Sequence, residues 1–323
     1  MKFVDLKKSL SSLSNVYLIS GDDRFLCYNA LEQIVEAASV NMKDMNMVDM
    51  NSPTASDIVA SANIYPFGDE RRVVVVHDYA PKSGDKEKKE IEAYLLSPMP
   101  STVLIFFNLS DDTFISKFKD KLTYVDCNKL DAGSISKYIS KSLESVGVSA
   151  DQSAINLLAL YCLYDMQRIS GEINKLTSYL GGEGRLTDDI VKQMVVQDKE
   201  YQVFSLAEYI SRGDASRALD LVNSLYDKSG GFGLLGALYN NYRRLLYVAV
   251  TKASDQELAK ALGTKEFAVK MLKNQLGVFS PRKIKTIVDY LGELDSNIKQ
   301  GKIKEEIAIK TAVVKILKIR NSK

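Results

Sequence analysis

The stretch VYLISGDDRFLCYNAL, residues 16–31, has the strand, glycine turn and helix start of a possible nucleotide-binding loop. A working phosphate loop follows G-x-x-x-x-G-K-[ST], because several backbone N–H groups, a lysine and a hydroxyl together hold phosphate and magnesium. Here Gly21 is the single glycine, and Asp22 and Asp23 follow it. Carboxylates at this place repel a triphosphate, and Arg24 adds only one positive charge. The stretch therefore predicts a helix start whose acids complement the helix dipole.

Other residues offer little catalytic or metal-binding chemistry. His77 is the one histidine, and no G-x-S-x-G nucleophile elbow accompanies it. Cys27, Cys127 and Cys162 are isolated in the sequence, unlike the paired cysteines of zinc sites and disulfide frameworks. A strand-end acidic pair that could polarise water is also missing, since one strand runs into His77 and another into Asn108. We predict no catalytic residue, no metal, no cofactor, and buried thiols in a reducing compartment.

A different kind of site is indicated by NIYPFGDERRVVVV, residues 63–76. The four valines are typical of a strand that is buried on both faces. Pro66 and Gly68 favour a turn directly before it, and the charged residues that follow place this turn at the surface. Tyr65 and Phe67 would then be aromatic rings within reach of water. They could contact a partner, or they could fold back onto their own domain.

The charge balance excludes a protein that binds polyanions through its bulk charge. There are 43 Lys and Arg against 41 Asp and Glu, a formal net charge of +2. Local basic residues are candidates for DNA or subunit contacts, or for solvated helix edges. These candidates are Arg243, Arg244, Lys299, Lys302 and Lys304. Because no aromatic residues lie among the lysines, stacking on single-stranded bases is not expected there.

Length and composition describe an ordinary globular protein. The chain has 323 residues, of which 46% are hydrophobic and 26% charged, which suggests two or three domains. The N-terminus is too polar for a signal peptide. No apolar run approaches the roughly 20 residues that cross a bilayer. We expect a cytoplasmic protein without a membrane partner.

Strand and helix patterns alternate in the first part of the chain. Strands are expected at residues 15–20, 45–50, 73–76, 101–107 and 123–127, and helices at 25–38, 52–62 and, after a polar start, 82–96. Pro53 is tolerated at the start of the second helix. Strands joined through helices predict a mostly parallel sheet that is covered on both faces.

From residue 131 onward the strand signals fade and helical periodicity takes over. Helices are expected at 135–143, at 155–162, at 166–180 before Gly181 and Gly182, and after Thr187; longer ones follow at 203–210, 215–226, 233–250, 255–262, 280–299 and 305–319. Long apolar stripes of this kind pack internally, associate with other subunits, or do both. Periodicity does not separate these outcomes.

Several of these segments, in this order, resemble the delta subunit of the bacterial DNA polymerase III clamp loader. The family opens with a Tyr-Leu-hydrophobic-x-Gly-[Glu/Asp]-Asp-x-[Phe/Tyr]-Leu segment and has a [Leu/Pro]-Phe-x-x-x-Arg-[Arg/Gln] turn before an aliphatic strand. The similar segments are residues 16–34, 65–78, 203–226, 235–248 and 261–284. Each motif is weak alone, but their shared order along nearly the whole chain makes the resemblance specific.

The resemblance implies an α/β domain followed by all-α domains. An AAA+-like parallel sheet domain without a functional phosphate loop would span 1–131, a small helical lid domain 132–198 and a helical collar domain 199–323. The family does not hydrolyse ATP. It binds the ring-shaped sliding clamp, the beta subunit, and lets one interface of the ring open so that the clamp can be placed on primed DNA. The collar joins the gamma/tau and delta prime subunits in a pentamer.

The resemblance also implies where the clamp binds. The family's clamp-binding element ends in a hydrophobic residue and a phenylalanine, which by position are Pro66 and Phe67, with Ile64 and Tyr65 adjacent. Many relatives have leucine in place of Pro66, so Tyr65 is expected to supply the lost apolar area. Two more residues are expected at the polar rim of this site; they are Arg71 and Arg72.

Two other functions stay open at this point. One is a nucleotide-binding AAA+ ATPase or switch protein, which the missing lysine after Gly21 disfavours. The other is a helical DNA-binding scaffold that does not contact the clamp. Binding of a nucleotide would favour the first, and loss of clamp binding on substitution of Phe67 would exclude the second.

Overall fold

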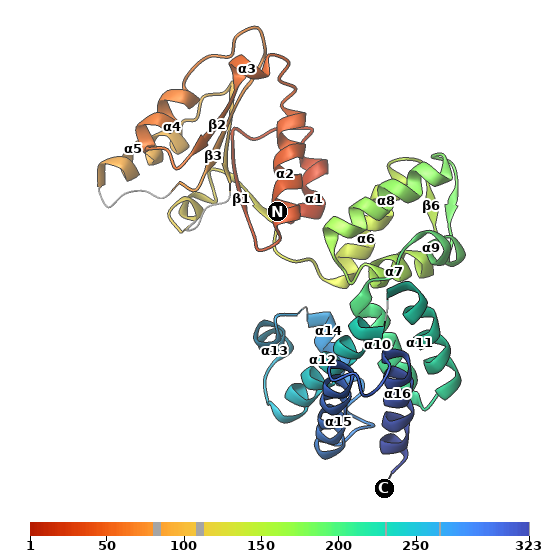
Figure 1. The fold of residues 1–323 in the computed structure, drawn as a ribbon. Helices are drawn as coiled ribbons and strands as arrows, with labels where there is room; N and C mark the ends of the chain where they lie inside the picture. Colours follow the sequence, from red (N-terminus) through yellow and green to blue (C-terminus); the bar gives the residue numbers. More distant parts are fainter. Residues whose placement is uncertain (80–84, 108–112, 230, 265, 323) are drawn as a thin grey trace. The chain divides into compact units, whose positions relative to one another are not determined.

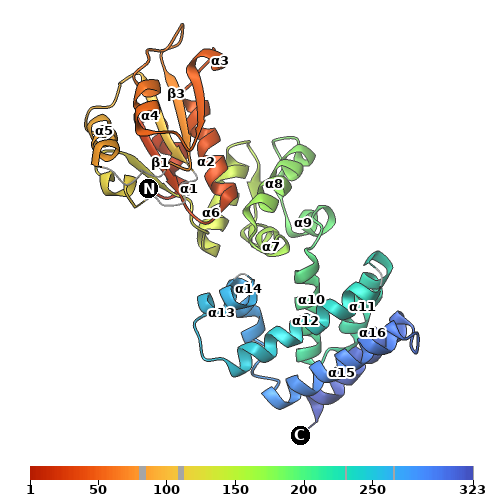
Figure 2. The same ribbon diagram turned by 60° about the vertical axis from the view of Figure 1, so that its left-hand side comes forward.

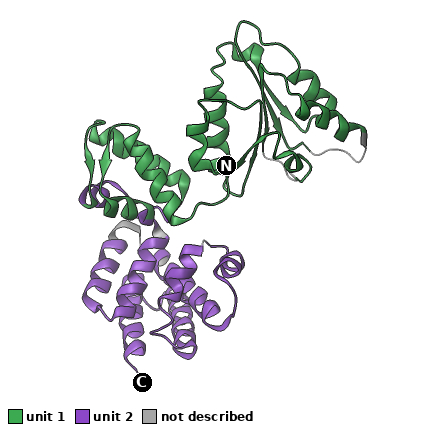
Figure 3. Cartoon of the chain, turned by 180° about the vertical axis from the view of Figure 1, so that it is seen from behind, with its two compact units in different colours: residues 1–159, 164–188 green, residues 160–163, 189–323 purple. Residues whose placement is uncertain are grey.

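The structure is a computed structural model that describes residues 1–79, 85–107, 113–229, 231–264 and 266–322 (Figure 1). The polar segment expected at 82–84 and the predicted strand exit at Asn108 lie outside the described residues. The chain divides into two compact units, one of residues 1–159 and 164–188 and the other of residues 160–163 and 189–323 (Figure 3).

A parallel sheet forms the centre of the first part of the chain. In the described residues its strand order is β2-β3-β4-β1-β5, with every neighbouring pair parallel. The strands are β1 (Val16–Ser20), β2 (Met47–Asn51), β3 (Arg72–His77), β4 (Thr102–Phe107) and β5 (Thr123–Asp126). The four valines of β3 are fully buried, as their β-branched run predicts.

Helices cover both faces of this sheet (Figures 1 and 2). They are α1 (Phe3–Ser9) and α2 (Arg24–Ala37) on one face, and α4 (Ala55–Ala62) and α5 (Asp85–Leu96) on the other, with a 3-10 helix η1 (Ile115–Phe118). The predicted helix 52–62 begins three residues late, because Thr54 is its extended N-cap and shares a capping box with Asp57. The short helices α1 and α3 (Lys43–Asn46) were not predicted.

The chain then continues as helices. These are α6 (Ala132–Glu144), α7 (Gln152–Tyr161), α8 (Met166–Leu180) and α9 (Asp188–Met194). The predicted end of the third helix is confirmed, since Gly181 takes a left-handed φ of +65° at its C-cap. The expectation that this part of the chain contains no strands is wrong in one detail. Two short strands, β6 (Ser149–Ala150) and β7 (Arg185–Leu186), pair in parallel. Two-residue strands are too short to give an alternating pattern.

The second unit is helical throughout its described residues, apart from the connections. It contains α10 (Lys199–Arg212), α11 (Ala215–Ser229), α12 (Gly231–Val250), α13 (Asp255–Leu262), α14 (Glu266–Lys273), α15 (Pro281–Lys299) and α16 (Glu305–Asn321). Leu235, Leu238, Tyr242 and Leu245 form the buried stripe that the sequence predicts for α12. Among the described residues, no helix is both long and apolar enough to span a membrane.

The predicted fold class is confirmed: a parallel α/β sheet domain precedes an all-helical remainder. The division into three domains, with boundaries at 131 and 198, stays a prediction. The division into two units follows contacts along the chain and places the first helices after the sheet together with it.

Candidate functional site

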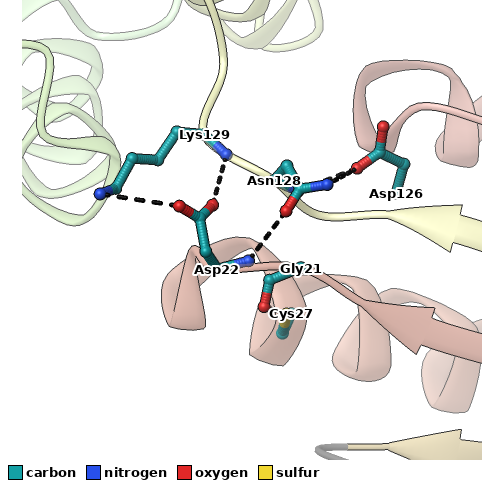
Figure 4. Close-up of polar contacts among 6 residues, drawn as sticks. All are labelled: Gly21, Asp22, Cys27, Asp126, Asn128 and Lys129. Carbon is teal, nitrogen blue, oxygen red and sulfur yellow. Dashed lines mark hydrogen bonds and ion pairs between the residues drawn. The ribbon is translucent and has the colours of Figure 1, made fainter. Parts of the chain in front are cut away.

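The turn after β1 is packed against the chain that leaves β5. A Cβ added at Gly21 would lie 2.1 Å from the carbonyl carbon of Cys127. The Asp23 amide donates to the Cys127 carbonyl at 3.2 Å, and the Asp22 amide donates to the Asn128 side chain at 3.2 Å (Figure 4). Protein acceptors therefore occupy two of the amides that a phosphate loop would present to its ligand.

The two carboxylates of this turn are also engaged. Asp22 accepts a hydrogen bond from the Lys129 amide at 2.8 Å, and its second oxygen lies 3.7 Å from the Lys129 ammonium (Figure 4). Asp23 accepts from the Leu26 amide at 3.2 Å as the N-cap of α2. The prediction of a helix start with favourably placed acids is confirmed. The geometry disfavours an anion here, because acidic groups lie where phosphate would have to enter.

The isolated histidine has ordinary partners at the end of β3. Its Nε2 lies 2.8 Å from the Asp49 carboxylate on the neighbouring strand, and its ring packs edge-on against Phe107 with centroids 5.1 Å apart. His77 is thus a strand-end residue, as predicted. Within the described residues, no cluster of three or more His, Cys, Asp or Glu side chains could hold a metal.

The turn between α4 and β3 carries its aromatic side chains outward. Tyr65 is 75% exposed and Phe67 is 63% exposed, with Ile64 exposed as well and Pro66 half-buried. The alternative that the rings fold back onto their own domain is therefore wrong for this structure. Exposed large apolar side chains that lie together mark an interaction surface more often than scattered single ones do.

The backbone of this turn is fixed by a buried side chain from α3. Phe67 donates its amide hydrogen to Asn46 Oδ1 at 2.8 Å, and Asn46 Nδ2 donates to the Phe67 carbonyl at 2.8 Å. Asn46 is fully buried, so losing either bond would leave a desolvated polar group. The aromatic ring is thus exposed on a backbone that is held at two points.

A carboxylate completes this connection. Asp69 accepts from the Met42 amide at 2.9 Å and from the Asn46 side chain at 2.7 Å, and it also accepts from the backbone and side chain of Asn41. Hydrogen bonds from Met42 and then Asn46 lower the pKa of Asp69, because they favour its charged form. Between Phe67 and Asp69, Gly68 takes a φ of +71°, a backbone conformation that glycine adopts without strain.

The expected rim position of Arg72 is wrong. Arg72 is buried, and its guanidinium donates to the Met45 carbonyl at 2.6 Å and to the Ser61 carbonyl at 3.2 Å. It therefore joins the ends of α3 and α4 beneath the turn. The reason is its place in β3, where it pairs with Thr102 in the sheet. Arg71, one residue earlier, is half-buried and stays a rim candidate.

Sequence reasoning missed the two residues that position this turn, Asn46 and Asp69. A weak signal was present, since a Gly-Asp pair after an aromatic residue favours a turn in which the carboxylate bonds nearby amides. Nothing in the sequence indicated that the amides would come from a segment more than twenty residues earlier.

Comparison with known families assigns the chain. A family model described as "DNA polymerase III, delta subunit" matches residues 17–128. A second, described as "DNA polymerase III delta subunit, C-terminal domain", matches residues 200–316. Together the two matches cover more than half of the chain. The chain belongs to the DNA polymerase III delta subunit family.

Full-length relatives agree with this delta subunit assignment. DNA polymerase III subunit delta of Bacillus subtilis (strain 168) is 25% identical, over 99% of this chain and 98% of that protein. The probable DNA polymerase III subunit delta of Aquifex aeolicus (strain VF5) is 21% identical, over 87% of this chain and 85% of that protein. The solved Bacillus subtilis DNA clamp loader delta protein matches with a TM-score of 0.77 at 22% identity, over 98% of this chain and 99% of that chain. That likeness shows a shared delta-subunit fold.

The basic candidates of this delta-family chain lie on two separate parts of the second unit. On α12, Arg243 is exposed, whereas Arg244 is half-buried and forms an ion pair with Glu200. Around the connection from α15 to α16, Lys299 pairs with Asp295 at 2.6 Å, and Lys302 and Lys304 are exposed. Arg244 and Lys299 thus have acidic partners within the chain, while their roles toward DNA or other subunits stay predictions.

Proposed function

We propose that this delta-family chain binds the sliding clamp through the turn Ile64–Phe67 and lets one interface of the ring open for loading onto primed DNA. The observation that carries this proposal is the outward turn itself, with two largely exposed rings on a backbone fixed by Asn46. A surface of this kind is suited to a protein partner and not to a small-molecule reaction.

The energetics of the turn support tight docking. Full burial of a phenylalanine-sized side chain contributes roughly 1.5–3 kcal/mol. A few such anchors dominate the affinity of many interfaces. Pro66 restricts its own φ, and the Asn46 bonds hold the Phe67 backbone, so little conformational entropy is lost when the rings dock.

Opening the ring requires a difference in affinity between two clamp conformations. A ligand that binds both states equally leaves their equilibrium unchanged, however tightly it binds. The turn must therefore fit the relaxed, open clamp better than the closed one. A rigid turn favours such discrimination, because it does not adapt its shape to the closed ring.

The proposal includes no ATP hydrolysis by this chain. It is supported at the Gly21 turn, where the Asp22 and Asp23 amides have acceptors within the chain. Any energy from ATP would then enter through other subunits of the pentamer, which would contain gamma/tau and delta prime. Residues 199–323 would form the collar that joins these partners, and primed DNA would be contacted through the assembly.

The test is an equilibrium titration of the full chain with the sliding clamp of the same organism, without nucleotide. Truncation of a central anchor costs about 2 kcal/mol or more, so Phe67→Ala should weaken binding roughly 30-fold or more. Leu96→Ala is a matched control, because Leu96 is also largely exposed, at 60%, and belongs to α5 and not to the turn. Circular dichroism should be unchanged in both variants.

The same protein preparation also tests the alternative function, a nucleotide-binding ATPase or switch protein. Titration with ATP should show neither binding nor hydrolysis by the isolated chain. Equal clamp affinity for wild type and Phe67→Ala would remove Phe67 from the site. Tight ATP binding would instead favour a nucleotide-dependent switch.

A further inference from the structure

Exposed apolar side chains are concentrated near the turn to a degree that Ile64–Phe67 alone does not explain. Five of the sixteen exposed large hydrophobic residues of the described chain lie between residues 42 and 67. Three belong to the turn. The other two are Met42, 47% exposed, and Met45, 56% exposed, at the start and within α3. Single exposed apolar residues are normal on any surface, but a cluster of five marks an interaction site.

These methionines are held to the turn and not merely near it. A Cβ added at Gly68 would lie 3.0 Å from the Met42 sulfur, so the Met42 thioether packs directly against the turn. Its amide is bonded to Asp69 at 2.9 Å. The Met45 carbonyl accepts from buried Arg72 at 2.6 Å. Both side chains are thus presented from a backbone that is fixed to the same network.

Asn46 joins the two halves of this surface. It follows Met45 directly and bonds both backbone groups of Phe67 at 2.8 Å. A displacement of α3 would therefore move the phenylalanine as well. The backbones that carry the methionines and the rings are thus tied together. We call their exposed side chains the α3–turn surface, defined as Met42, Met45, Ile64, Tyr65 and Phe67.

We infer that Met42 and Met45 are a second contact element for the sliding clamp, beside the aromatic turn. The inference rests on the proposed function. Its occupant is the same clamp protomer, because Met42 packs at Gly68, directly beside Phe67, and Met45 precedes the Asn46 that holds the Phe67 backbone. Methionine has three rotatable bonds and a polarisable sulfur, so it packs against irregular apolar surfaces. Rigid rings provide the fit to one clamp conformation, and the flexible thioethers cover the adjacent surface as the ring interface moves.

Peroxide footprinting of the wild-type complex tests this contact directly. Hydrogen peroxide transfers one oxygen to an accessible thioether, giving the sulfoxide and water, and mass spectrometry measures the rate at each methionine. A saturating concentration of clamp should slow oxidation of Met42 and Met45 at least fivefold. Met1 is the internal control, since it is 44% exposed in the free chain and lies outside the α3–turn surface, and its rate should not change.

Clamp affinities of variants provide the second measurement. Met42→Ala and Met45→Ala should each weaken binding about tenfold, which corresponds to about 1.4 kcal/mol. Met42→Leu and Met45→Leu keep the apolar area and should stay within about threefold of wild type. Thermal unfolding of each variant shows whether the packing against Gly68 has been lost, and the leucine variants remain informative if Met42→Ala is unstable.

The outcomes separate this inference from the proposed function. If Phe67→Ala loses affinity while both methionines oxidise at the free rate and their alanine variants bind normally, the turn binds the clamp and the second contact is wrong. If the clamp does not bind wild type, or Phe67→Ala binds as well as wild type, the proposed function itself fails and this inference fails with it. Protection of the methionines by self-association without clamp, seen in sedimentation, would assign the surface to a second copy and overturn the inference.

Discussion

Two turns of the same α/β domain differ in what they leave for a partner. At Gly21 the amides and carboxylates are bonded to the chain around Cys127, Asn128 and Lys129. At Phe67 the backbone is bonded just as completely, to Asn46, but the rings remain in solvent. In the first turn, the groups that could bind a ligand form hydrogen bonds within the fold. In the second, hydrogen bonds fix the backbone, and the side chains stay exposed for docking.

The comparison teaches that a loop's capacity to bind depends on which of its groups the fold has already used. Phosphate binding needs backbone amides, so a turn whose amides are internally bonded cannot serve it. Protein docking needs apolar area on a rigid backbone, so the same internal bonds assist it. Variants that break one turn at a time should therefore have different consequences.

The largest effect is expected at the Gly21 turn. Gly21→Ala would place a Cβ 2.1 Å from the Cys127 carbonyl carbon, a contact that requires the backbone to move. Overpacking against backbone should lower the free energy of unfolding by about 3 kcal/mol or more. Urea denaturation measures it. Gly171→Ala is the control, because nothing lies within 4 Å of its added Cβ on α8. A Gly21→Ala protein as stable as wild type would mean that the turn is not packed as described.

The next effect concerns the bond between α3 and the aromatic turn. Asn46→Ala removes both hydrogen bonds to Phe67 and the one to Asp69. Buried groups left without partners cost about 1–3 kcal/mol, so stability should fall by that amount. Clamp affinity should also fall, roughly tenfold, because the free turn then has conformational entropy to lose.

Asn41→Ala is the matched control for Asn46→Ala, since Asn41 is exposed and bonds Asp69 without contacting the Phe67 backbone. It should leave clamp affinity near the wild-type value. If Asn46→Ala loses stability but binds the clamp normally, the rigidity of the turn does not contribute to docking, and the contrast between the two turns would rest on exposure alone.

Features of the fold and the site that depend on residues close together in the sequence were predictable, whereas contacts between distant residues were not. The buried valine strand, the parallel sheet and the surface turn at Pro66 follow from local patterns, and each is observed. The rim position predicted for Arg72 was wrong because the sequence does not show which of the two adjacent arginines starts β3. Arg72 does, and its side chain is buried there. The Asn46 bonds to Phe67 join segments 21 residues apart, and a four-residue α3 is too short to show helical periodicity.

A smaller effect is expected at Gly68, where conformation and contact can be separated. Gly68→Ala forces a residue with a Cβ into φ +71° and brings that atom 3.0 Å from the Met42 sulfur. The left-handed conformation costs about 1–2 kcal/mol for a residue other than glycine. Gly263→Ala, with φ +59° and nothing within 4 Å, should show the same cost without the contact. A larger loss of stability at Gly68 than at Gly263 then measures the packing of Met42 against the turn.

The smallest effect is a dependence of the turn on acidity. Hydrogen bonds from Met42 and Asn46 lower the native pKa of Asp69 below its unfolded value, so its contribution to stability is present above the unfolded pKa of about 4. As pH falls through the lowered native pKa, the carboxylate gains a proton and that contribution is lost. Clamp affinity should therefore show no loss from Asp69 between neutral pH and about pH 5, and should weaken only as pH falls through that lowered pKa and the turn loosens. An NMR titration of the Asp69 carboxyl measures the pKa.

Asp131→Asn is the control, because Asp131 also has a lowered pKa, through Ser134 at the start of α6. The Asp131→Asn substitution should leave the acid dependence of clamp binding unchanged. The Asp69→Asn variant should bind the clamp more weakly already at neutral pH. If Asp69 titrates at its unfolded pKa, its hydrogen bonds to α3 do not hold in solution.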